Sequence, residues 1–227
     1  MSPPSDISES DRAILARLAS FTMTSVERQV ALIEATRYLV RRRIPGSLVE
    51  CGVWRGGSVM AALLTLIDEG VMDRDVYLYD TFSGMTQPTD VDKTFDGMLA
   101  RTHLERDVSR SGYWCVAQLD DVRNNVLSTG YPEHRIHFVK GPVEETLPAY
   151  SPPEAIALLR LDTDWYESTK RELTALFPKV SHGGVMIVDD YGHWQGAKLA
   201  VDEFLQQSSE VYYLHRIDYT GRLLIKS

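Results

Sequence analysis

The stretch Ser47-Leu-Val-Glu-Cys-Gly-Val-Trp-Arg-Gly-Gly-Ser58 decides the fold class. Residues 47–51 form a short apolar run typical of a buried strand, and residues 52–57 form a glycine-rich turn. The segment from Ser58 to Glu69 reads as a helix and ends before Gly70. This order of strand, turn and helix predicts one unit of an α/β sheet.

Further apolar runs repeat that pattern along the chain. We expect strands at 76–80, 136–140, 156–162 and 184–189. Because helical or loop stretches separate these runs, the pattern is typical of a parallel sheet covered by helices on both faces. Residues 211–215 and 222–226 flank a short turn, so we expect a hairpin and an antiparallel last strand.

Two helices are expected before the first strand. Residues 6–18 offer Ser8 as an N-cap, and Thr24 has capping-box spacing to Glu27 at the start of the second helix. We therefore treat residues 1–45 as an N-terminal helical cap.

A long polar segment, residues 81–131, follows the second expected strand. We expect two helices in it, at 95–105 and 117–128. An insertion of this length just past the carboxyl end of a strand is typical of a substrate lid, so we expect it to cover the acceptor site.

Composition bounds the class of protein. The 227 residues, 44% hydrophobic and 25% charged, suffice for one domain over 1–227 and are few for two. A net charge of −8 disfavours nucleic acid and anionic membranes as partners. We expect a cytoplasmic protein, because no signal-peptide pattern or membrane-length apolar run is present. Cys51 and Cys115 form no CxxC pattern and are expected to be reduced.

Acidic residues stand at the ends of most expected strands: Glu50, Asp80, Asp162, Asp189 and Asp190. The carboxyl ends of parallel strands meet at one crevice, so these acids should converge on one pocket. Each acid alone is equally explained as the cap of the following helix. Their number favours a ligand site.

The glycine-rich turn differs from the GxGxxG pattern of dinucleotide binding. Glu50 would repel a pyrophosphate and could hold an ammonium group, which favours a zwitterionic ligand such as S-adenosylmethionine. Asp80, about 30 residues later, suits the two ribose hydroxyls of an adenosine. Because the GxGxxG pattern is missing, a nicotinamide-dependent oxidoreductase is disfavoured.

A second group of acids suits a metal ion. Asp162, Asp189 and Asp190 would form an oxygen-only site for Mg²⁺, with Mn²⁺ or Ca²⁺ as alternatives. Without a cation, crowded carboxylates raise one another's pKa. Asp164 is a candidate general base, and His193 is the alternative as base, as acceptor-binding residue or as a solvent-facing loop histidine.

The sequence resembles the macrocin O-methyltransferase (TylF/MycF) family, whose Mg²⁺- and S-adenosylmethionine-dependent members methylate sugars of natural products. Five stretches between about Thr22 and Leu205 carry the resemblance: 44–57, 79–85, 140–148, 159–169 and 183–192. It implies a Rossmann-like, seven-stranded class I methyltransferase sheet, mostly parallel, with an antiparallel last strand and helices on both faces. Residues 90–131 show no match and leave the acceptor open.

The resemblance also implies roles for single residues. Glu50, Gly52 and Ser58 would line the methionine end of the cofactor, Asp80 and Phe82 would hold its ribose and adenine side, and Gly141 would complete the adenine pocket. Asp162, Asp189 and Asp190 would hold the metal, so that Asp162 and Asp164 are the expected catalytic residues, Asp164 as the base. Residues 21–25 would cover the cofactor.

The expected reaction is methylation of a sugar hydroxyl in a glycosylated natural product of macrolide, aminocoumarin or enediyne type. The expected enzyme is a homo-oligomer, a dimer or larger. A metal-dependent catechol or phenylpropanoid O-methyltransferase is the first alternative, although such enzymes usually carry Asn where this chain has Asp190. A non-catalytic module that binds an adenosine ligand is the second.

Overall fold

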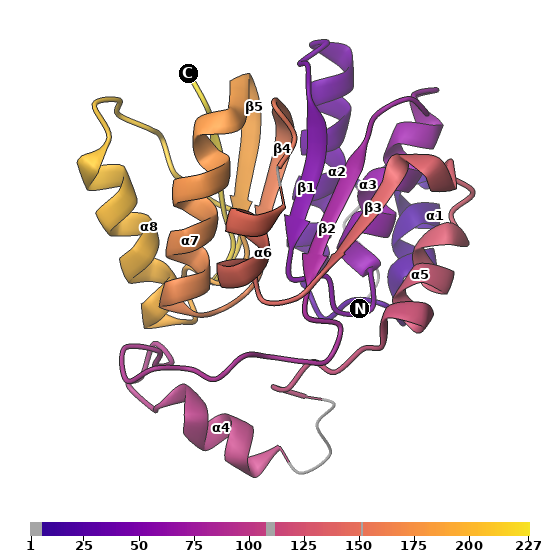
Figure 1. Cartoon of the computed structure of the whole chain (residues 1–227). Helices are drawn as coiled ribbons and strands as arrows, with labels where there is room; N and C mark the ends of the chain where they lie inside the picture. The colour runs from indigo at the N-terminus through magenta and orange to yellow at the C-terminus, as the bar shows by residue number, and fades with distance from the viewer. Residues whose placement is uncertain (1–5, 108–111, 151) are drawn as a thin grey trace.

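The computed structural model describes residues 6–107, 112–150 and 152–227 (Figure 1). These residues form a seven-stranded sheet of order β3-β2-β1-β4-β5-β7-β6. The strands are β1 (Ser47–Cys51), β2 (Val76–Asp80), β3 (Ile136–Lys140), β4 (Ile156–Leu161), β5 (Val180–Val188), β6 (His215–Arg216) and β7 (Arg222–Ile225). The first five are parallel, and β7 is antiparallel to both neighbours, β5 and β6. The expected mostly parallel α/β sheet is confirmed.

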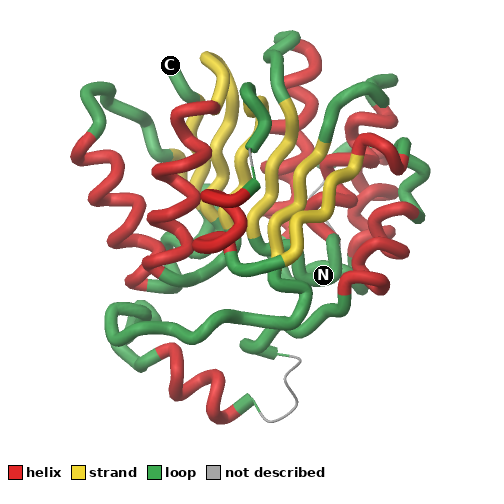
Figure 2. Tube along the Cα trace, in the orientation of Figure 1, coloured by secondary structure: helices red, strands yellow, loops and turns green. Residues whose placement is uncertain are grey.

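Helices cover both faces of this sheet (Figure 2). One face carries α1 (Glu9–Leu18), α2 (Val26–Arg41), α3 (Gly57–Asp68) and α5 (Leu119–Leu127). The other carries α6 (Val143–Ala149), α7 (Tyr166–Leu176) and α8 (Gln195–Gln207). Single 3₁₀ turns at Glu133–Arg135 and Phe177–Lys179 lead into β3 and β5. In Figure 1 the short helix α4 (Ala100–Arg106) lies below the sheet, apart from the others.

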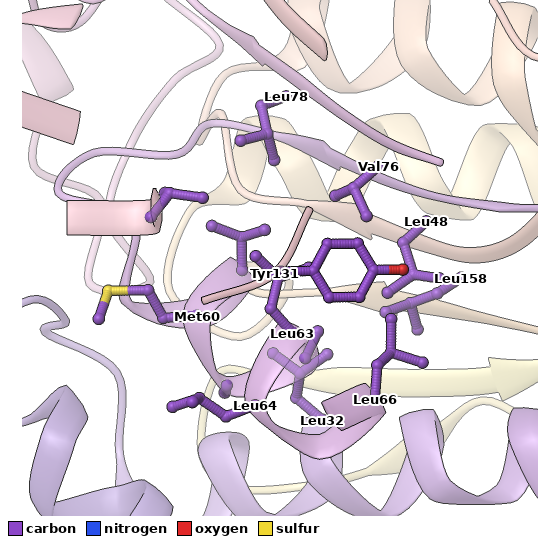
Figure 3. Close-up of a cluster of buried hydrophobic side chains, with 14 of the residues drawn as sticks. Leu32, Leu48, Met60, Leu63, Leu64, Leu66, Val76, Leu78, Tyr131 and Leu158 are labelled. Carbon is purple, nitrogen blue, oxygen red and sulfur yellow. The ribbon is translucent and has the colours of Figure 1, made fainter. Parts of the chain in front are cut away.

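The sheet separates two apolar cores because successive strand residues point to opposite faces. Leu48 and Leu158 pack against α2 and α3, among the side chains shown in Figure 3. Their neighbours Val49 and Leu159 pack against α6 and α7. Helix α3 is apolar all round and buried from Gly57 to Leu66, which is expected of a helix enclosed by the sheet and other helices.

The helix starts agree with the sequence in one case and shift by one residue in the other. Ser8 accepts a hydrogen bond from Asp11 N at 3.1 Å and caps α1, as expected. Helix α2 is capped by Ser25, which accepts from Arg28 N at 3.1 Å, so the predicted Thr24 cap is wrong. The Thr24 hydroxyl instead bonds to that of Thr22 at 2.9 Å, which leaves the cap position to its neighbour.

Two predicted elements are shorter than expected. Residues 211–214 alternate in side-chain burial, with Tyr213 exposed, but pair with no described strand; only His215–Arg216 forms the hairpin with β7. The helix predicted at 95–105 begins at Ala100, because Thr94 N donates to Met98 O at 2.9 Å and closes a turn before it.

Part of the predicted lid is fixed to the body by a buried acid. Asp92, fully buried, accepts hydrogen bonds from Thr89 N at 2.7 Å and from Tyr166 N, at the start of α7, at 2.8 Å. Trp165 and Trp194 pack beside it in a small third apolar cluster with α4. The division into an N-terminal cap at 1–45 and a lid at 81–131 stays a prediction, and residues 1–5 and 108–111 within it lie outside the described part.

Within the described ranges, no helix is both long enough and apolar enough to span a bilayer.

Candidate active site

A cavity of about 490 Å³ lies at the carboxyl ends of the five parallel strands. Its lining includes a residue at or just after each strand end: Gly52, Asp80, Gly141, Asp162 and Asp189. The predicted site residues Ser58, Asp164, Asp190 and His193 line it as well. The topology of the sheet therefore brings together most of the residues singled out in the sequence.

Two predicted cofactor residues do not face this cavity. Phe82 is 1% exposed and packs into the core beside α3. Glu50 is 6% exposed, and its carboxylate lies against Arg160. Direct contact of either side chain with a cofactor stays a prediction.

The turn between β1 and α3 needs glycine for steric reasons. Gly52 has φ of +81°, and a Cβ there would lie 1.9 Å from Asp162 O. A Cβ at Gly57 would lie 2.5 Å from Phe21 O, where residues 21–24 approach the turn. The strand end, the turn and the N-terminal segment are thus packed backbone to backbone along one wall of the cavity.

Asp80 holds that turn in place. Its Oδ2 accepts from Val53 N at 2.6 Å and from Trp54 N at 3.1 Å, and its Oδ1 accepts from Phe82 N at 2.7 Å. Burial raises the pKa of Asp80, while these three amides favour its ionised form. A carboxylate has about four acceptor positions; the three amides use three of them, and the Thr81 hydroxyl lies 3.5 Å from Oδ1 at the fourth. The predicted contact with two ribose hydroxyls stays a prediction.

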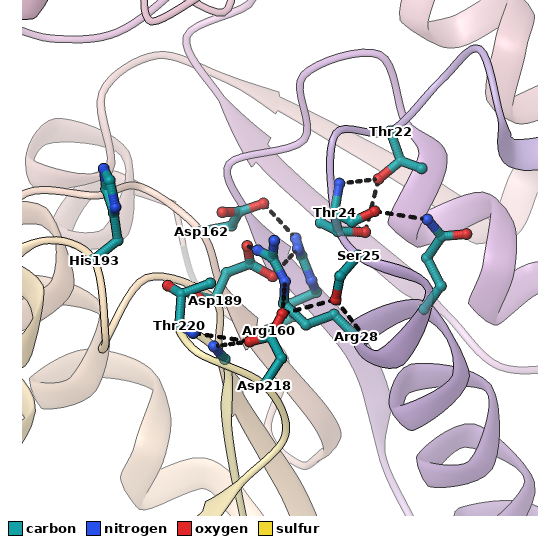
Figure 4. Close-up of polar contacts among 12 residues, drawn as sticks. Thr22, Thr24, Ser25, Arg28, Arg160, Asp162, Asp189, His193, Asp218 and Thr220 are labelled. Carbon is teal, nitrogen blue, oxygen red and sulfur yellow. Dashed lines mark hydrogen bonds and ion pairs between the residues drawn. The ribbon is translucent and has the colours of Figure 1, made fainter. Parts of the chain in front are cut away.

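A buried ion network lies beneath the cavity. Arg160, on β4 and 4% exposed, donates to Glu50 Oε1 and to Asp162 Oδ2, both at 2.7 Å, and also to Asp189. Arg28 of α2 bonds to the other oxygen of Asp189 (Figure 4). Asp189 is therefore held between two guanidinium groups.

These surroundings shift the ionisation of the network. Burial raises the pKa of Glu50 to about 8, against the opposing attraction of Arg160. Burial raises the pKa of Asp189 to about 6, and the nearby Asp162 adds to the rise. Arg28 also forms an ion pair with Asp218: Nε of Arg28 lies 3.1 Å from Oδ2 of Asp218.

The sequence reasoning missed both arginines. Arg160 had a signal, because it is a charged residue within the apolar run of β4, and a buried guanidinium requires carboxylate partners. Arg28 had no such signal in the sequence, because nothing distinguishes it from the other charged residues of an amphipathic helix.

A second cluster of acids, which shares Asp162 with the ion network, faces the cavity. One carboxylate oxygen from each of Asp162, Asp164 and Asp190 lies within 4.8 Å of the others. Oδ2 of Asp190 is buried, and no described residue hydrogen-bonds to it. Burial raises the pKa of Asp164 to about 7, and burial with the neighbouring Asp164 raises that of Asp190 well above its usual range. This acid cluster contains two of the three predicted metal ligands and the predicted base.

The acid cluster has the donor chemistry of a hard-cation site. All its potential donor atoms are oxygens, as Mg²⁺ prefers, and a bound cation would pair with the orphaned oxygen of Asp190. Asp189 differs, because its oxygens are engaged by Arg160 and Arg28. Its role as a metal ligand stays a prediction.

His193, the alternative base, lines the cavity outside the ion network (Figure 4). Its Nδ1 contacts the hydroxyl of Tyr219, and its ring packs edge-on to Trp194 at 4.7 Å. Burial lowers the pKa of His193. The histidine therefore belongs to an aromatic group beside the acids, and its catalytic role is untested.

Known proteins resemble this chain over most of its length. A family model described as macrocin-O-methyltransferase (TylF) matches residues 7–226. Demethyldecarbamoylnovobiocin O-methyltransferase of Streptomyces niveus is 34% identical over 200 residues, which cover 88% of this chain and 73% of that protein. A rhamnosyl-tetracenomycin-C 4'-O-methyltransferase of Streptomyces olivaceus is 34% identical over 170 residues, or 75% of this chain and 62% of that protein.

A solved structure agrees with the fold. The O-methyltransferase NovP is 33% identical and superposes with a TM-score of 0.78, covering 91% of this chain and 82% of that one. The expected class I methyltransferase architecture is thereby confirmed.

Proposed function

This chain belongs to the macrocin O-methyltransferase (TylF) family and is an O-methyltransferase. We propose that it transfers the methyl group of S-adenosylmethionine to a sugar hydroxyl of a glycosylated natural product. The observation that carries the proposal is the acid cluster, with its orphaned Asp190 oxygen, in the same cavity as the glycine turn after β1. One half of the cavity suits the cofactor, and the other suits a hydroxyl held for deprotonation.

The cofactor half favours a cationic ligand. Gly52, Ser58, Asp80 and Gly141 all line the cavity. We assign Gly52 and Ser58 to the methionine end of the cofactor, and Asp80 and Gly141 to its adenosine. Carboxylates outnumber guanidinium groups along the lining, so the cavity carries an excess of negative charge. The sulfonium and ammonium groups of S-adenosylmethionine would offset this charge, whereas a pyrophosphate would add to it. This balance supports S-adenosylmethionine over a dinucleotide.

The residues of the acid cluster fit Mg²⁺. Asp162 and Asp190 would hold it, with either Asp164 or the predicted Asp189 as a third ligand. When bound, the ion would lower the pKa of the acceptor hydroxyl and offset the charge of the carboxylates.

The chain's own residues complete the reaction. Asp164, at φ of +68°, stands three residues beyond the end of β4 in a conformation rare for a non-glycine residue. Such strain often marks a functional residue. We propose that its carboxylate takes the proton of the acceptor hydroxyl as the methyl group is transferred in line.

The direct test is transfer of labelled methyl from S-adenosylmethionine to a panel of glycosides, with and without a chelator. We expect transfer to a sugar hydroxyl, lost with EDTA and restored by Mg²⁺. Asp164→Asn should lower kcat by at least about 100-fold with the affinity for S-adenosylhomocysteine unchanged. Asp73→Asn, at an exposed position, is the matched control. Failure to bind S-adenosylhomocysteine, or transfer to catechols alone, would overturn the proposal.

We further propose that the enzyme is cytoplasmic and homo-oligomeric, and that residues 81–131 act as its lid. Light scattering of the purified chain measures the number of subunits, and a monomer at micromolar concentration would contradict the proposed assembly.

A further inference from the structure

An aromatic rim, defined as Phe95, Tyr113, His193, Trp194 and Tyr219, lies beside the acid cluster. All but Phe95 line the cavity. The ring of Phe95 lies 5.9 Å from that of His193 and 6.0 Å from that of Tyr219, yet its side chain is largely in solvent, with the residue 65% exposed. A large apolar ring held at the edge of a cavity has a face free for a ligand.

Backbone contacts fix three chain segments of this rim. Gln195 N donates to Lys93 O at 2.7 Å, which ties the segment of Phe95 to that of Trp194. Gly192 N donates to Thr220 O at 2.9 Å, which ties the segment of His193 to that of Tyr219. The segments that carry four of the five rings are therefore tied to one another, which reduces the entropy lost when a ligand stacks on those rings.

The rim continues directly from the acid cluster. His193 N donates to Asp190 O at 3.0 Å. Burial raises the pKa of Tyr219, and the nearby charge of Asp190 adds to the rise. An acceptor whose hydroxyl reaches the acid cluster would therefore extend its attached ring system over the rim.

The charge of the lining selects against an anionic acceptor. Among the described residues, Arg28 is the single guanidinium in the lining, no lysine lines it, and Arg28 is paired with Asp189 and Asp218. A sugar diphosphate would meet carboxylates without a free cationic side chain. A neutral ring system meets aromatic faces instead.

We propose that the aromatic rim is the acceptor-recognition surface, and that Phe95 determines specificity by stacking on a neutral ring attached to the reacting sugar. This inference rests on the proposed function and adds the chemistry of the group beyond the sugar. Phe95 acts on binding of the acceptor and not on binding of the cofactor or on the chemical step.

Three rhamnose derivatives that differ at the anomeric carbon, in the attached group, test the proposal; rhamnose is chosen because one relative is named for a rhamnosyl substrate. They are 4-nitrophenyl α-L-rhamnoside, methyl α-L-rhamnoside and dTDP-L-rhamnose, titrated against protein saturated with S-adenosylhomocysteine. We expect the aryl rhamnoside to bind about tenfold more tightly than the methyl one, and dTDP-L-rhamnose to bind no better than the methyl one. Phe95→Ala should remove most of this preference, and Phe95→Trp should keep it.

Tyr213→Ala, which removes an 82% exposed ring outside the cavity lining, is the matched control and should keep the full preference. Equal binding of aryl and methyl rhamnosides, an unchanged preference in Phe95→Ala, tightest binding of dTDP-L-rhamnose, or no rhamnoside binding would overturn the inference. If the preference depends on Phe95 but no methyl is transferred to any glycoside, the rim stands and the proposed reaction fails.

Discussion

Asp189 and Asp190 are neighbours in the chain, yet they belong to two regions of opposite character. Asp189 lies in the ion network, where Arg160 and Arg28 engage its two oxygens. Asp190 lies in the acid cluster, where one buried oxygen has no hydrogen bond from any described residue. The comparison teaches that two successive carboxylates at one strand end are not equivalent ligands: the oxygens of Asp189 are already paired with guanidinium groups, whereas Asp190 has a buried oxygen with which a cation would pair.

The largest effect should come from removing the cation of the ion network. Arg160→Met leaves Glu50, Asp162 and Asp189 without their shared partner, so the free energy of unfolding should fall by about 3–5 kcal/mol in urea denaturation. The exposed Arg42→Ala should change it by less than about 0.5 kcal/mol. Adding Asp189→Asn to Arg160→Met should recover part of the loss. A loss below about 1 kcal/mol would show that the carboxylates do not depend on Arg160.

The next largest effect should be a difference in Mg²⁺ affinity between variants of the two aspartates. Asp190→Asn should weaken Mg²⁺ binding by more than about tenfold, because it removes the unpaired carboxylate oxygen. Asp189→Asn should weaken Mg²⁺ binding less and stability more, because it deprives two guanidinium groups of a partner. Calorimetry with S-adenosylhomocysteine bound measures the first quantity, and urea denaturation measures the second.

Equal loss of Mg²⁺ affinity in the two variants would contradict this partition. It would mean that Asp189 leaves Arg28 or Arg160 when the ion binds, which is the ligand set predicted from the sequence. Asp164→Asn completes the series, since it weakens metal binding only if Asp164 is the third ligand.

A smaller effect is expected at Glu172, a fully buried carboxyl that forms an ion pair with no described guanidinium and lies near enough to Asp162 and Asp164 for their charges to raise its pKa. Its Oε1 accepts from the Thr163 hydroxyl at 2.9 Å, and no described group hydrogen-bonds to Oε2. Burial raises its pKa well above the usual range. The folded state therefore retains a proton that the unfolded state releases near pH 4.3, and stability falls as pH rises from there toward the folded pKa.

Glu172→Gln mimics the protonated carboxyl and cannot ionise. Its melting temperature relative to the wild type should therefore rise between pH 5 and pH 8. The exposed Glu167→Gln serves as the control and should show no such trend. A difference that is constant with pH would show that Glu172 is not held protonated by burial.

Much of the fold could be read from the sequence. The strands β1, β2 and β3 have the predicted bounds, because each is a short apolar run with turn residues on both sides. The prediction failed where contacts with the rest of the chain overrode the local signal. Residues 211–214 alternate like a strand but pair with no described strand, and the turn around Phe95 delays the start of α4.

The sequence by itself determined the convergence of acids at one edge of the sheet, because a parallel order places all carboxyl ends together whatever the loops between them do. Only the tertiary structure decided how those acids divide. Arg28 comes from a helix 161 residues before Asp189, and the aromatic rim joins segments as far apart in the chain as Phe95 and Tyr219. Ion pairing and desolvation depend on distances of a few ångströms and on burial, which no local pattern of residues encodes.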